Sequence, residues 1–77
     1  VLHITSNQIR MGIHINRIKA VLAENNRTNR WLAESLGKNE ATVSRWCTNE
    51  TQPSVEVLYQ ISKLMDIDIR DLFNKTK

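Results

Sequence analysis

The sequence has few of the residues that stabilise small secreted or metal-bound proteins. Among its 77 residues are one cysteine, one proline and two glycines. The single cysteine, Cys47, cannot form a disulfide within the chain, which excludes a disulfide-stapled secreted protein and favours the reducing cytoplasm. The two histidines, His3 and His14, have no metal-ligand spacing with Cys47, so we expect no metal and no other cofactor.

Long apolar runs are also missing from the sequence. No stretch approaches the roughly 18 residues of a membrane span, and the start lacks the pattern of a signal peptide, so we expect no membrane partner. The scarcity of glycine and proline disfavours a turn-rich all-β fold. A chain below roughly 80 residues builds one core, so the sequence predicts a single all-α domain.

The charged residues are unevenly distributed along the chain, whose net charge is +3. Residues 10–45 contain seven basic and three acidic side chains, whereas residues 46–77 contain four and five. A basic N-terminal part suggests that one face binds a polyanion. An ordinary solvated charge pattern explains the same counts equally well.

The helical pattern divides the chain into three parts. Residues 1–14 show no sustained apolar period, and Met11 is a candidate for the original translation start. This part is therefore expected to be a flexible arm or an upstream extension. A helical domain is expected over residues 15–74, with a tail at 75–77.

Apolar spacing and capping residues predict five short helices in the domain. The first is predicted from three apolar residues at helical spacing, Ile15, Ile18 and Leu22. The later four follow residues whose side-chain oxygens can cap a helix N-terminus: Thr28, Asn39, Ser54 and Asp68. The first three end at residues that adopt or tolerate positive φ or compete for backbone hydrogen bonds: Asn25-Asn26, Gly37 and Thr48-Asn49.

The second and third predicted helices have the spacing of a helix-turn-helix. Ala33 is small enough for close helix approach, and Gly37, four residues later, can supply the positive φ of a tight turn. Val43 then places a stiff branched side chain at the junction of the two helices.

Residues 15–73 resemble the Cro/CI-type, XRE-like helix-turn-helix family of bacterial and phage transcriptional regulators. The matching segments are TNRWLAESLG at 28–37, NEATVSRW at 39–46, Pro53-Ser54, and MDIDIRDLF at 65–73. The sequence departs from the usual family pattern at Cys47, where Glu is common, and at Asn49 and Asp66, where Gly is common. The resemblance implies a compact five-helix, lambda-repressor-like domain.

The resemblance also implies that the helix at 40–47 enters the major groove of double-stranded DNA. Arg45 can pair with guanine O6 and N7 or reach a phosphate, and Glu40 can accept from cytosine N4. The candidate base-contacting residues are Glu40, Ala41, Thr42, Ser44 and Arg45. The candidate phosphate-contacting residues, through side chains or backbone amides, are Thr28, Asn29, Arg30, Lys38, Asn39, Asn49 and Thr51.

Several apolar residues have two interpretations. Trp46 is predicted to lie in the core, and Trp31 either packs against the first helix or stacks on bases. Cys47 is either a half-buried small hydrophobe or a redox-sensing thiol. The last two helices have more apolar residues than so small a core needs, which suggests that some of them form a dimer interface: Tyr59, Ile69, Leu72 and Phe73.

These observations predict a sequence-specific DNA-binding transcriptional regulator, a repressor that acts as a homodimer on a near-palindromic operator. Enzymatic activity is not expected, because the sequence has no recognisable catalytic set and no phosphate-binding glycine loop. A protein-interaction module, such as an antitoxin or an operon controller with a protein partner, is the alternative.

Overall fold

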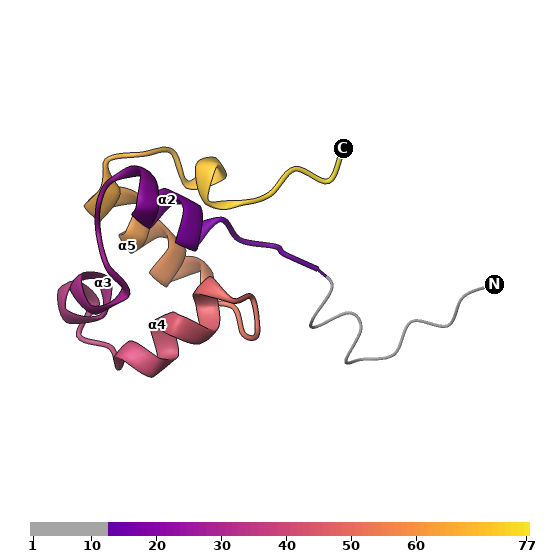
Figure 1. Cartoon of the computed structure of the whole chain (residues 1–77). Helices are drawn as coiled ribbons and strands as arrows, with labels where there is room; N and C mark the ends of the chain where they lie inside the picture. Colours follow the sequence, from indigo (N-terminus) through magenta and orange to yellow (C-terminus); the bar gives the residue numbers. More distant parts are fainter. Residues whose placement is uncertain (1–12) are drawn as a thin grey trace.

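The computed structural model describes residues 13–77, which contain four α-helices followed by one 3-10 helix (Figure 1). The elements are α2 (Ile18–Glu24), α3 (Asn29–Leu36), α4 (Glu40–Cys47), α5 (Val55–Met65) and the 3-10 helix η1 (Ile69–Leu72). The all-α class is confirmed, and the fifth predicted helix is a single 3-10 turn. The predicted arm at 1–14 lies outside the described residues except for Ile13 and His14.

The predicted helix boundaries after the first helix are confirmed by their caps. In each of the four N-caps a side-chain oxygen accepts a hydrogen bond from a backbone N–H in the first turn: Thr28 from Trp31 (3.0 Å), Asn39 from Ala41 (2.8 Å), Ser54 from Val57 (3.2 Å) and Asp68 from Arg70 (2.8 Å). Four turns contain a residue with positive φ: Asn26 (55°), Gly37 (66°), Asn49 (62°) and Asp66 (55°). Asn and Asp therefore adopt the left-handed conformation that glycine usually supplies.

The first helix begins later than the sequence predicted. Ile15 lies outside α2 and its side chain is 47% exposed, whereas the polar residue Asn16 is buried. The side-chain oxygen of Asn16 accepts from the backbone N–H of Ile18 at 3.0 Å, and Asn16 forms an isolated antiparallel bridge with Phe73. Residues 15–16 are therefore held extended against the C-terminal segment, which apolar periodicity does not reveal.

The core is formed where the helices and η1 meet. It contains Ile18, Val21, Leu22, Leu32, Ala33, Val43, Trp46, Cys47, Leu58, Ile61, Met65 and Leu72. Helix α3 packs against α4, and η1 packs against α5. Ala33 and Val43 are both buried, as the helix-turn-helix spacing predicted, and Trp46 is confirmed as a core residue.

Part of the predicted dimer interface belongs to this core instead. Leu72 is fully buried, and Ile69 is half-buried against the core, because η1 folds back over α5. The backbone carbonyl of Leu72 accepts from the N–H of Arg17 at 2.8 Å, which fastens the end of the domain to its start. Leu72 is therefore not available for an interface, whereas Tyr59 and Phe73 stay exposed.

Candidate nucleic-acid interface

Helix α4 separates into a buried side and an exposed side. Its apolar residues Val43, Trp46 and Cys47 are buried in the core. The five candidate base-contacting residues are exposed or, for Thr42, half-buried: Glu40, Ala41, Thr42, Ser44 and Arg45. Because positions 40, 41, 44 and 45 share one helix face, the structure brings these side chains together on the surface opposite the core.

The N-terminus of α3 and the turn before α4 provide further exposed polar groups. Thr28, Arg30, Lys38 and Asn39 are exposed, and Asn29 is half-buried. The guanidinium of Arg30 lies 3.2 Å from the carboxylate of Glu34 on the same helix. The N-terminus of an α-helix presents backbone N–H groups and a partial positive charge, which suit a phosphate.

The structure does not favour the predicted phosphate contact of Asn49. Its side chain is only 4% exposed, and its backbone N–H donates to the carbonyl of Trp46 at 3.0 Å. The N–H of Thr51 likewise donates to the carbonyl of Arg45 at 3.3 Å, which leaves the exposed hydroxyl of Thr51 for contacts outside the domain. Asn49 turns inward because it anchors the loop after α4.

A cluster of three amide side chains forms this anchor: the buried Asn16 and Asn49 and the exposed Gln52. The Oδ1 atom of Asn49 accepts from the N–H groups of Ile15 (2.8 Å) and Asn16 (2.9 Å) and from Gln52 Nε2 (3.0 Å). The Nδ2 atom of Asn16 donates to Gln52 Oε1 at 2.7 Å and to the carbonyl of Trp46 at 2.9 Å. The amide cluster therefore joins the segment before α2 to the C-terminal end of α4. Sequence reasoning missed Asn16 and Gln52, because their contact joins residues 36 positions apart.

A groove of 550 Å³ runs between α2 and the C-terminal end of α4. Its basic lining residues are His14, Arg17 and Lys19, and none of the described residues that line it is acidic. Lys19 is exposed on α2 and was also missed, although its place opposite the apolar stripe of the helix is visible in the sequence. The groove thus places basic side chains beside the C-terminal end of α4.

Cys47 lies in the wall of this groove. Its thiol donates to Asn29 Oδ1 at 3.3 Å. Burial raises the pKa of the Cys47 thiol, and the nearby positive charge of Lys19 opposes that shift only in part. Since a redox-sensing cysteine needs a lowered pKa, this environment favours the interpretation of Cys47 as a small buried hydrophobe. Among residues 13–77, no group of three or more His, Cys, Asp or Glu side chains could hold a metal ion.

Comparisons with known proteins agree with this geometry. The family model described as "Helix-turn-helix" matches residues 18–72, which is more than half of the chain. The chain belongs to this XRE-like helix-turn-helix family. It is also similar to a crystal structure described as a "putative DNA-binding protein from Bacteroides fragilis", with 57% identity and a TM-score of 0.77 over 78% of this chain and 97% of that chain. No curated protein matches the chain.

The other tryptophan of this helix-turn-helix domain, Trp31, packs against the core and is only partly exposed. The guanidinium of Arg27 lies 4.5 Å from the centroid of its ring, a cation–π contact on the outer side. Because the ring packs against the core and Arg27 lies over it, the packing interpretation of Trp31 is favoured over base stacking.

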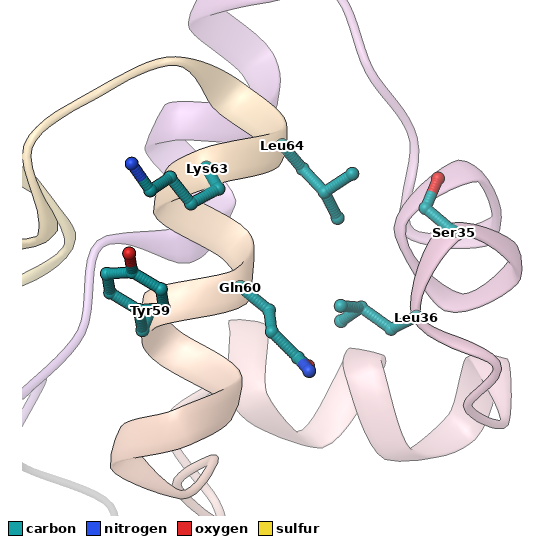
Figure 2. Close-up of a pocket in the computed structure, with 6 residues that line it drawn as sticks. All are labelled: Ser35, Leu36, Tyr59, Gln60, Lys63 and Leu64. Carbon is teal, nitrogen blue, oxygen red and sulfur yellow. The ribbon is translucent and has the colours of Figure 1, made fainter.

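A second surface lies away from α4, where α3 and α5 meet. Figure 2 shows Leu36 and Leu64 pointing toward one another across a pocket of 430 Å³, with Tyr59 and Lys63 on its α5 side. Tyr59 and Leu64 are 55% and 42% exposed, and the ammonium of Lys63 lies 5.5 Å from the Tyr59 ring centroid. This helix-turn-helix domain thus has an apolar surface distinct from its polar α4 face.

None of its described helices is long and apolar enough to cross a membrane.

Proposed function

We propose that the protein is a non-enzymatic, sequence-specific transcriptional regulator that inserts α4 into the major groove of double-stranded DNA. The observation that carries the proposal is the exposed face of α4, on which four of the five candidate base-contacting residues lie, with Thr42 half-buried at its edge and the opposite face buried. A DNA-bound domain of this kind represses transcription when its site overlaps a promoter. Sequence would be read by α4, with each good side-chain-to-base pair worth about 1–3 kcal/mol.

Phosphate contacts are proposed on both sides of α4. The N-terminus of α3, with Thr28, Asn29 and Arg30, provides helix N–H groups and a cation for one strand. Lys38 and Asn39 lie in the turn before α4, and the hydroxyl of Thr51 lies in the loop after it. To these we add Lys19, because it lies in the basic groove beside α4. These contacts would fix the position of the domain on the duplex without reading its sequence.

A homodimer is proposed for the active form. The surface of Leu36, Tyr59 and Leu64, together with Phe73, exposes apolar side chains that a second copy could cover. A two-fold dimer would place two α4 helices about 34 Å apart, which matches two half-sites of a near-palindromic operator.

The proposal is tested by measuring binding to duplex DNA over a series of salt concentrations. We expect affinity to fall steeply with salt. Lys38→Ala should lower affinity on every duplex and reduce the slope of log K against log salt by about 1. Arg45→Ala should weaken binding about 10- to 100-fold on a selected duplex and less on a mixed-sequence duplex. Arg70→Ala removes an equal charge from η1, so it controls for the change in net charge.

Absence of salt-sensitive duplex binding would contradict this function. Stable co-purification with one protein partner, combined with that absence, would favour the protein-interaction alternative.

A further inference from the structure

The chain folds back on itself directly after α4. Asn49 adopts the left-handed conformation, with φ of 62°, and the chain reverses there. The N–H groups of Glu50 and Thr51 then donate to the carbonyl of Arg45, at 2.9 and 3.3 Å. This reversal therefore places Glu50 beside Arg45, which lies in the preceding helical turn.

This reversal brings two opposite charges together on the exposed side of α4. The carboxylate oxygen Oε2 of Glu50 lies 3.8 Å from Nε of Arg45, and the two side chains are 62% and 56% exposed. Both can therefore meet a ligand that approaches α4.

The position of Glu50 is set by the buried loop and not by the ion pair itself. Exposed ion pairs contribute little to stability, so the pair alone would not hold the loop. The buried amide of Asn49 does so, because it receives hydrogen bonds from the N–H groups of Ile15 and Asn16 and donates one to the carbonyl of Asn16 at 3.1 Å. The carboxylate is thus presented to Arg45 by a rigid backbone.

We infer that Glu50 is a specificity-determining residue, which directs Arg45 toward a guanine and away from phosphates. This inference rests on the proposed function of DNA binding by α4. An arginine reads guanine with two parallel N–H groups directed at O6 and N7. With Nε beside Glu50, the two terminal amino groups of Arg45 remain for this bidentate contact.

The charge of Glu50 also acts against the alternative contact. A phosphate that approached Arg45 would approach the Glu50 carboxylate as well, and the two negative charges repel. Guanine O6 and N7 carry no formal charge, so this repulsion is weaker for base readout. Glu50 therefore lowers affinity for all duplexes, but it lowers affinity for mixed-sequence DNA more than for the selected site.

The experiment compares Glu50→Gln with the unsubstituted protein on two duplexes of equal length. One duplex is selected by the unsubstituted protein from a random DNA pool, and the other has mixed sequence. Glu50→Gln keeps the side-chain shape, removes the charge and affects an exposed residue, so the fold is retained. We expect affinity for the mixed duplex to rise about two- to fivefold and affinity for the selected duplex to rise less, so that the ratio of selected to mixed affinity falls.

Two further variants show whether the effect passes through Arg45. In an Arg45→Ala background, Glu50→Gln should leave the ratio of selected to mixed affinity unchanged, because the side chain that it directs is absent. Glu34→Gln is the matched control, since Glu34 pairs with Arg30 on α3 at 3.2 Å, where only phosphate contacts are proposed. It should raise affinity for both duplexes by the same factor.

A chemical probe tests the contact with guanine directly. Replacing each guanine of the selected duplex in turn by 7-deazaguanine removes the N7 acceptor. Replacement of the guanine that Arg45 contacts should weaken DNA binding by the unsubstituted protein and leave binding by the Arg45→Ala variant unaffected. It should weaken binding by the Glu50→Gln variant less than binding by the unsubstituted protein.

An unchanged or increased ratio of selected to mixed affinity for Glu50→Gln, with duplex binding intact, would overturn the inference and leave the proposed function standing. Failure of the unsubstituted protein to bind any duplex would overturn both.

Discussion

The buried side chain of Asn49 allows the contribution of one residue to be predicted in detail. Asn49 holds a left-handed backbone, with φ of 62°, and its side chain is 4% exposed. Alanine at this position would lose the acceptor for the N–H groups of Ile15 and Asn16 and would also strain the backbone. Glycine would lose the same acceptor without the strain, so Asn49→Ala and Asn49→Gly together separate the two effects.

The expected magnitudes follow from these contacts. A buried donor left without a partner costs about 1–3 kcal/mol, and a left-handed residue with a Cβ costs about 1–2 kcal/mol. We therefore expect Asn49→Ala to lower the free energy of unfolding by about 2–5 kcal/mol, and Asn49→Gly by about 1–3 kcal/mol. A domain of this size has a total stability of only a few kcal/mol, so the alanine variant should be partly unfolded at 37 °C.

Urea unfolding monitored by circular dichroism measures both values. Amide hydrogen exchange adds a local measurement, because the N–H groups of Ile15 and Asn16 should lose protection in the glycine variant while the core keeps it. A loss below about 1 kcal/mol for alanine, or equal losses for alanine and glycine, would refute the assigned role of the Asn49 side chain.

Three further predictions concern other parts of the domain. Gly37→Ala should lower the free energy of unfolding by about 1–2 kcal/mol, because φ is 66° at this position. The loss should not be larger, since an added Cβ meets no atom within 4 Å. A loss above about 4 kcal/mol in urea unfolding would reveal a clash that the structure lacks. Cys47 should react with iodoacetamide more slowly in the folded protein than in urea, because burial raises its pKa. Above about pH 9 the unfolded thiol loses its proton while the folded thiol keeps it. The stability of the protein relative to Cys47→Ala should therefore fall as the pH rises above about 9. A stability difference that stays constant with pH would contradict the raised pKa. Tyr59→Asp should dissociate the proposed homodimer in sedimentation velocity, and an unchanged dimer would exclude this surface as the interface.

Helix boundaries were predictable wherever the hydrogen bonds that set them are local. Thr28, Asn39, Ser54 and Asp68 each cap a helix through a backbone N–H only two or three residues ahead. Such contacts depend on residue type and short spacing, both of which the sequence shows. The boundary before α2 was missed, although Asn16 accepts from the N–H of Ile18 two residues ahead, because its other contacts are with groups 30 or more residues away.

The candidate interface was predictable to a similar degree. The face of α4 that exposes Glu40, Ser44 and Arg45 follows from helical periodicity and from the apolar side chains at Val43 and Trp46. The contact between Glu50 and Arg45 did not follow, because it depends on the direction of the chain after the left-handed turn.

The sequence by itself determined the all-α class, the caps, the helix-turn-helix spacing and the family, because helices and their ends are specified by residues a few positions apart. Only the tertiary structure decided that Leu72 closes the core and that Asn49 faces inward. It also decided that the groove beside α4 is lined by Lys19. The physical reason is distance along the chain: burial and buried hydrogen bonds join segments that no local pattern relates, such as Asn16 and Asn49, which are 33 positions apart.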